Sequence, residues 1–184
     1  MIRPLFFALL AGAVIGPGLP VRGQTATAQP ATAYPTAPSI LSVDDKAEME
    51  AVIVRLNHAL DAADYNLYTS YFAEDAEFVS GFGVAKGRAE IADALDQSRP
   101  FITGKRHVAS NFLFEGDGDK AVATTYLIVF ERAASVDYVG SAINADTFRK
   151  RGGVWELVRH ESALDPSTLA AMQAGYVAVG VPGV

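Results

Sequence analysis

The fold is decided by the stretch KRHVASNFLF, residues Lys105–Phe114, which ends at the turn Gly116–Asp119. Aromatic, β-branched and small polar residues followed by glycines predict a β-strand. Successive side chains of a strand point to opposite faces, so His107 and Asn111 would share one face. Buried polar side chains need hydrogen-bond partners. We therefore expect this face to line a polar network or a cavity that the rest of the chain encloses.

The first 28 residues predict a segment that is removed from the mature protein. Residues 1–28 start with a basic residue, continue with a short apolar run and end among small residues. This order is typical of a secretory signal peptide, with cleavage expected after Gly23 or after Ala28. Because the apolar run is shorter than the roughly 20 residues that span a bilayer, no stable membrane anchor is expected after signal removal. The protein would be exported, either periplasmic or secreted.

The amino-acid composition excludes several kinds of functional site and partner. The chain of 184 residues contains no cysteine, which excludes disulfides, thiol catalysis and cysteine zinc sites. Its net charge is −6 and no basic patch is present, so nucleic acid is not expected as a partner. The three histidines lie on distant segments without metal-ligand spacing. The glycines of Gly81–Gly87 lack the spacing of a dinucleotide fingerprint. We expect a site without metal or cofactor.

The remaining chain divides into a linker, a domain and a tail. Residues 29–41 consist largely of Ala, Thr, Pro and Ser and predict a disordered linker. Residues 42–173 form the folded domain, and residues 174–184 are an apolar, glycine-rich C-terminal tail without predicted structure.

Within the domain, helices come first and long strands follow. Ser42 and Asp45 have the spacing of a helix start, and apolar residues then recur at helical intervals to about Ala63. Asp64 would cap a short second helix ending at Phe72, and a third helix is expected over 88–97, after a short strand at 76–80. Four long strands are expected at 105–114, 120–132, 138–151 and 154–162, before a terminal helix over 166–173. This order predicts an α+β fold, a curved antiparallel sheet wrapped around the N-terminal helices.

Several short motifs, in this order, resemble the SnoaL-like branch of the nuclear transport factor 2-like superfamily, whose members are cone-shaped α+β folds. They are Asp61–Tyr65, Phe72–Ala76, Gly87–Arg88, Arg106–Asn111, Gly118–Ala121 and Gly152–Trp155. The pattern is most similar to the scytalone dehydratase and hexachlorocyclohexane dehydrochlorinase group. The resemblance implies an Asp–His dyad inside the cone, at Asp61 and His107, and a pocket asparagine at Asn144.

Other positions depart from the dehydratase pattern. Leu60 stands where the dehydratase has a pocket tyrosine, Thr125 where it has a second histidine, and Ala142 where it has a serine. A different substrate is therefore expected.

His107 is the leading catalytic candidate, since imidazole titrates near neutrality and can act as a base. An aspartate bound to its other nitrogen would fix the tautomer. The alternative is a structural His–Asp pair that satisfies a buried polar group. Asp61 lies on the flank of the apolar stripe of its helix, so periodicity alone leaves open whether it faces solvent or a cavity.

Further polar residues could bind substrate if alternate strand positions face inward. They are Asn144, Asn111, Thr125, Tyr65, Tyr126 and Asp146, and each is equally explained by a structural contact or a core aromatic with a wet tip. His58 lies opposite the apolar stripe, and His160 lies beside charged residues. Both histidines are expected at the surface.

The resulting hypothesis is a cofactor-independent lyase or isomerase, of the dehydratase or elimination type, that acts on a small apolar organic molecule. His107 would be the general base and Asp61 its orienting partner. The alternative is a non-catalytic module of the same fold that binds a small ligand or dimerises. The superfamily resemblance also implies a homodimer.

Overall fold

The computed structural model describes residues 40–81, 83–133 and 137–173. The expected signal peptide (1–28), most of the linker (29–39) and the C-terminal tail (174–184) lie outside the described residues. Within the described part, no helix is long and apolar enough to cross a membrane.

Two helices start where the sequence predicted a cap. Helix α1 (Val43–Asp61) begins at Ser42, whose hydroxyl accepts from the Asp45 N–H while the Asp45 carboxylate accepts from the Ser42 N–H. This reciprocal pair is the capping box expected from the spacing. Helix α2 (Tyr65–Ser70) is capped by Asp64, whose carboxylate accepts from the Leu67 N–H at 3.0 Å. Two further helices, α3 (Gly87–Gln97) and α4 (Arg99–Ile102), precede the long strands.

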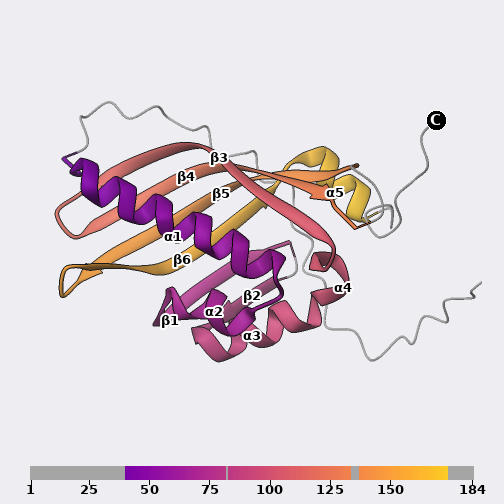
Figure 1. Ribbon diagram of the computed structural model, residues 1–184, viewed down its shortest axis with the longest axis horizontal. Helices are drawn as coiled ribbons and strands as arrows, with labels where there is room; N and C mark the ends of the chain where they lie inside the picture. Colours follow the sequence, from indigo (N-terminus) through magenta and orange to yellow (C-terminus); the bar gives the residue numbers. More distant parts are fainter. Residues whose placement is uncertain (1–39, 82, 134–136, 174–184) are drawn as a thin grey trace, which may run out of the picture. The chain divides into compact units, whose positions relative to one another are not determined.

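A curved, unclosed sheet of six strands forms the other layer (Figure 1). Its order is β2-β1-β6-β5-β4-β3. The members are β1 (Phe72–Ser80), β2 (Gly83–Lys86), β3 (Lys105–Asp117), β4 (Lys120–Glu131), β5 (Tyr138–Arg151) and β6 (Val154–Leu164). All neighbours are antiparallel except β1 and β6, which run parallel. The expected α+β class is confirmed, with a mixed sheet in place of a wholly antiparallel one.

The core lies between α1 and the inner face of the sheet, which α1 crosses (Figure 1). From α1 it receives the apolar stripe that the periodicity predicted, and from the sheet it receives alternate residues of each strand. Its largest fully buried apolar side chains are Phe72, Phe148, Met49, Ile91 and Leu157. Helix α5 (Pro166–Gln173) follows β6 and is tied to β5, because the Thr168 hydroxyl accepts from the Ser141 N–H at 2.9 Å.

The strict alternation expected for the stretch at 105–114 is wrong because β3 contains a bulge. Ser110 faces Tyr126 and Leu113 faces Thr124, so Asn111 and Phe112 together oppose Thr125. Asn111 adopts a left-handed conformation with φ 55° and is exposed, whereas Phe112 packs against the core. The extra residue changes which face each later side chain occupies. His107 and Asn111 therefore do not share a face.

Candidate active site between the first helix and the edge strand

Asp61 and His107 come from elements far apart in sequence that end side by side. Asp61 is the last residue of α1, which stops because Ala63 takes a left-handed conformation with φ 54° and the Asp64 N–H bonds back to the Ala59 carbonyl at 2.9 Å. His107 is the third residue of β3, the edge strand of the sheet. Helix α1 packs along this edge strand, and the flank that carries Asp61 faces it.

Asp61 holds His107 through two hydrogen bonds to one carboxylate oxygen. Asp61 Oδ1 lies 2.8 Å from His107 Nδ1 and accepts from the His107 backbone N–H at 3.1 Å. An edge strand leaves backbone N–H groups without a strand partner, and the carboxylate satisfies one of them here. The two side chains are about one-tenth exposed. Ring and backbone are thus fixed by the same acceptor.

Two arginines tie the helix end to the strand. Arg106 Nε lies 3.3 Å from Asp61 Oδ2, so the second carboxylate oxygen also has a cationic partner. Arg132 donates to the main-chain oxygens of Asp61 and Lys105, each at 2.9 Å. These bonds fix the carboxylate position without occupying the remaining nitrogen of the imidazole.

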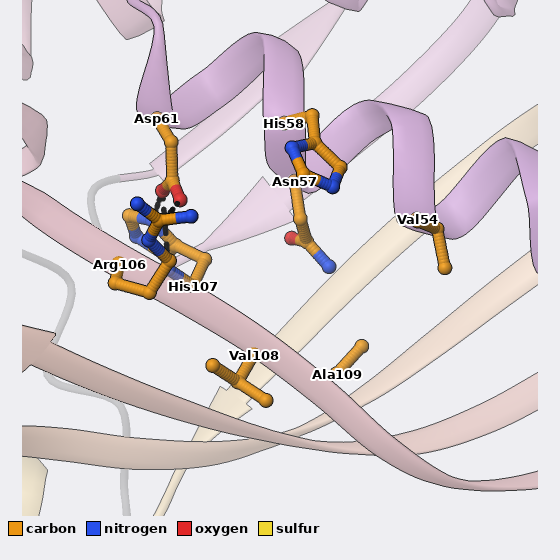
Figure 2. Close-up of a pocket in the computed structure, with 8 residues that line it drawn as sticks. All are labelled: Val54, Asn57, His58, Asp61, Arg106, His107, Val108 and Ala109. Atoms are coloured by element: carbon orange, nitrogen blue, oxygen red, sulfur yellow. Dashed lines mark hydrogen bonds and ion pairs between the residues drawn. The ribbon is translucent and has the colours of Figure 1, made fainter.

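A pocket of about 250 Å³ adjoins the pair, and we call it the α1–β3 groove (Figure 2). Its lining comes from α1 and β3 alone and comprises Val54, Asn57, His58, Asp61, Arg106, His107, Val108 and Ala109. Figure 2 shows Asn57 and Val54 directed from the helix toward the strand, with Val108 and Ala109 across from them. The volume lies below the usual range for drug-sized ligands, so the groove suits a small molecule.

The arrangement can move a proton. With Nδ1 held by Asp61, the tautomer is set and Nε2 is the nitrogen available to a molecule in the groove. Among the residues described, no group of three or more His, Asp or Glu side chains could hold a metal ion. An imidazole oriented in this way is of the kind that can take part in acid–base chemistry.

The other predicted site residues separate into two groups. Thr125, Asn144, Asp146 and Tyr65 are buried, and none of them lines the α1–β3 groove. Tyr126 is 51% exposed, because it follows inward-facing Thr125 and adjacent strand residues point to opposite faces. The inward placements expected for Asn111 and Tyr126 are wrong.

A second Asp–His pair was missed by the sequence reasoning. His160, expected at the surface, is buried at 9% exposure, and its Nδ1 lies 2.7 Å from Oδ1 of Asp146. The cause is a bulge in β6. Phe148 faces Leu157 but Thr147 faces Arg159, so Val158 is an extra residue and His160 turns to the inner face opposite Asp146. Regular pairing from the Gly152–Gly153 turn would have placed His160 outside.

Comparison with known proteins identifies the class first. Solved structures with an NTF2-like or cystatin-like fold match the domain. One is a protein of unknown function with a cystatin-like fold from Nostoc punctiforme, with 34% identity and TM-score 0.66, covering 69% of this chain and 96% of that one. Another is an NTF2-like protein from Novosphingobium aromaticivorans, with 30% identity and TM-score 0.62, covering 71% and 88%.

The family follows from a direct match. Residues 42–161 match the model of the SnoaL-like domain, and the chain belongs to that family. The structure of LinA shares the fold at 19% identity and TM-score 0.59, covering 66% of this chain and 86% of LinA. No curated protein matches the chain.

Proposed function

We propose that this protein is a cofactor-independent lyase or isomerase that acts on a small, largely apolar organic molecule in the α1–β3 groove. The observation that carries the proposal is the bond between His107 Nδ1 and Asp61 Oδ1 at 2.8 Å, beside a pocket with apolar and polar walls. Membership of the SnoaL-like family and the resemblance to the dehydratase and dehydrochlorinase group support the same class of reaction.

In the proposed reaction, His107 Nε2 removes a proton from a carbon next to a carbonyl or other activating group. The electron pair of the broken C–H bond forms a double bond, and in an elimination it expels hydroxide or halide from the adjacent carbon. In an isomerisation the imidazolium returns the proton to another carbon. Asp61 acts as a positioning residue that stabilises the imidazolium, and Asn57 is placed to orient the polar end of the substrate.

The test uses a panel of small cyclic ketones, β-hydroxyketones and β-haloketones, with hydrogen–deuterium exchange and product formation followed by NMR. We expect turnover or exchange by the wild type. His107→Ala should lower the rate by roughly 10³-fold, the usual size of a lost general base. Asp61→Asn should lower it less, because the imidazole remains. The matched control is Asp44→Asn, an exposed aspartate at the other end of α1.

Full activity of His107→Ala would show that the assigned role is wrong. If wild type binds panel members in the groove without exchange or turnover, the non-catalytic ligand-binding module is the correct function. The buried Ala142 and half-buried Leu60, at positions where the dehydratase has polar side chains, favour that alternative.

We also propose that the protein is exported and that it forms a homodimer. Tyr126 on the outer face of the sheet is 51% exposed and would suit contact with a second copy. Light scattering on the purified mature chain measures the oligomeric state, and fractionation of expressing cells measures export. A monomer would contradict the proposed dimer, and an unexported protein would contradict the proposed export.

A further inference from the structure

The α1–β3 groove contains a second imidazole, which has no role in the reaction proposed above. His58 lies on α1 one turn before Asp61, and it lines the groove together with His107 (Figure 2). Residues three apart on a helix have Cβ atoms roughly 5–6 Å apart, so His58 is a close neighbour of the carboxylate that holds His107. The two imidazoles therefore border one small space from different elements, His58 from the helix and His107 from the edge strand.

The two imidazoles differ in what holds them. His107 Nδ1 lies 2.8 Å from Asp61 Oδ1, and its side chain is about one-tenth exposed. His58 is exposed, and its imidazole makes no hydrogen bond or ion pair within the described part of the chain. A bonded carboxylate stabilises an imidazolium as it forms, which suits a base. An imidazolium without a carboxylate partner gives up its proton with less loss of interaction, which suits an acid.

Loss of water from a substrate needs both kinds of group. Chloride can depart from carbon as an anion, whereas hydroxide departs readily only when a proton reaches its oxygen as the C–O bond breaks. The other polar side chains of the groove do not supply that proton. Arg106, with Nε 3.3 Å from Asp61 Oδ2, stays protonated at any working pH, and an amide such as that of Asn57 is no acid. An imidazole can give a proton near neutrality.

We propose that His58 is the general acid of the reaction proposed above, on which this inference rests, and that the substrate is a β-hydroxycarbonyl compound. His107 Nε2 takes the proton from the carbon next to the carbonyl, and the electron pair of that C–H bond forms the double bond. The C–O bond breaks, and the oxygen takes the proton of the His58 imidazolium and leaves as water. Afterwards His107 gives its proton to solvent and His58 takes one from solvent.

The test compares two probes that differ only in the leaving group. They are 3-hydroxycyclohexanone and 3-chlorocyclohexanone, which both give cyclohex-2-enone, and NMR in D₂O follows product formation and deuterium uptake beside the carbonyl. We expect the wild type to eliminate both. His58→Gln should lose water from the hydroxy probe roughly 10²-fold more slowly, the loss typical of a missing general acid. It should eliminate chloride at the wild-type rate and retain deuterium uptake, because His107 still removes the carbon proton.

Two controls separate a catalytic from a structural role of His58. Arg55→Gln removes a positive charge from an exposed position of α1 outside the groove, and it should alter neither elimination. The thermal midpoint of His58→Gln should equal that of the wild type, because the imidazole has no described partner to lose. His107→Ala should lose both eliminations and deuterium uptake, so the two histidines give different patterns.

Several results would overturn the role of His58 and leave His107 as the base. They are unchanged loss of water in His58→Gln, equal slowing of the two eliminations, loss of deuterium uptake together with elimination, and a wild type that eliminates chloride alone. A wild type with neither elimination nor deuterium uptake would overturn the proposed function and this inference together.

Discussion

The two Asp–His pairs of this protein share one hydrogen bond and differ in almost everything around it. The Nδ1–Oδ1 distances are 2.8 Å for His107–Asp61 and 2.7 Å for His160–Asp146. The first pair joins a helix end to an edge strand and has Arg106 and an open groove beside it. The second lies between two central strands, with an aromatic ring on one side. The surroundings, and not the bond, distinguish a pair beside an open groove from a pair enclosed in the sheet.

The largest expected effect is on the free energy of unfolding, and it differs between the two pairs. Asp146→Ala should lower the free energy of unfolding by about 3 kcal/mol, because it leaves a buried imidazole without its partner. Asp61→Ala should cost about 1 kcal/mol, because water from the groove can reach the freed nitrogen and N–H. Urea unfolding of the two variants measures the difference. Equal losses of unfolding free energy in the two variants would contradict the expected difference in access of water to the two pairs.

A smaller effect should come from the β3 bulge, which concerns only the first pair. Asn111→Val should cost about 1 kcal/mol, because a β-branched residue is strained at the left-handed φ of 55°. Asn111→Gly should leave stability nearly unchanged. In NMR spectra the signals of His107 should move in Asn111→Val, while those of His160 should not. Movement of both would show that the two pairs are coupled through the sheet.

The last prediction concerns Asp45, at the other end of α1 from Asp61, and its readout is the pH dependence of stability. Its hydrogen bonds from Lys150, Ser42 and Trp155 hold the pKa of the carboxyl well below its ordinary value. A depressed folded-state pKa gives stability that is present above about pH 4 and is lost as the pH falls toward the folded-state pKa. Asp45→Asn should therefore flatten the acid limb of a stability–pH curve.

The matched control for that measurement is Asp44→Asn, the exposed neighbour of Asp45, which should leave the acid limb unchanged. An unchanged limb in Asp45→Asn would assign the acid sensitivity to other carboxylates.

Local sequence signals predicted much of the fold. Four local features lie at the positions that the sequence predicted. They are the Ser42–Asp45 capping box, the Asp64 cap and the two glycine turns between long strands. The parallel pairing of β1 with β6 could not be predicted in this way, because it joins segments about 80 residues apart in sequence, Phe78 and His160 among them. Such a pairing depends on tertiary packing and leaves no local signature.

The candidate site was predictable in part. The flank position of Asp61 followed from helical periodicity, and its meeting with His107 was expected from the family resemblance. The faces of Asn111 and His160 were predicted wrongly for one physical reason, a single extra residue in β3 and in β6. Period-two alternation contains no information about where a strand inserts such a residue.

The β3 bulge also affects how this site would be recognised in other chains. If Asn111 were deleted, Ser110 could still face Tyr126 and Phe112 could face Thr125, so every remaining side chain would keep its partner and its face. The distance in sequence between His107 and the following hairpin can therefore change by one residue without moving the imidazole. A search pattern with a fixed number of residues after the Arg–His dipeptide would miss such chains, whereas a pattern that permits one optional residue there would find them.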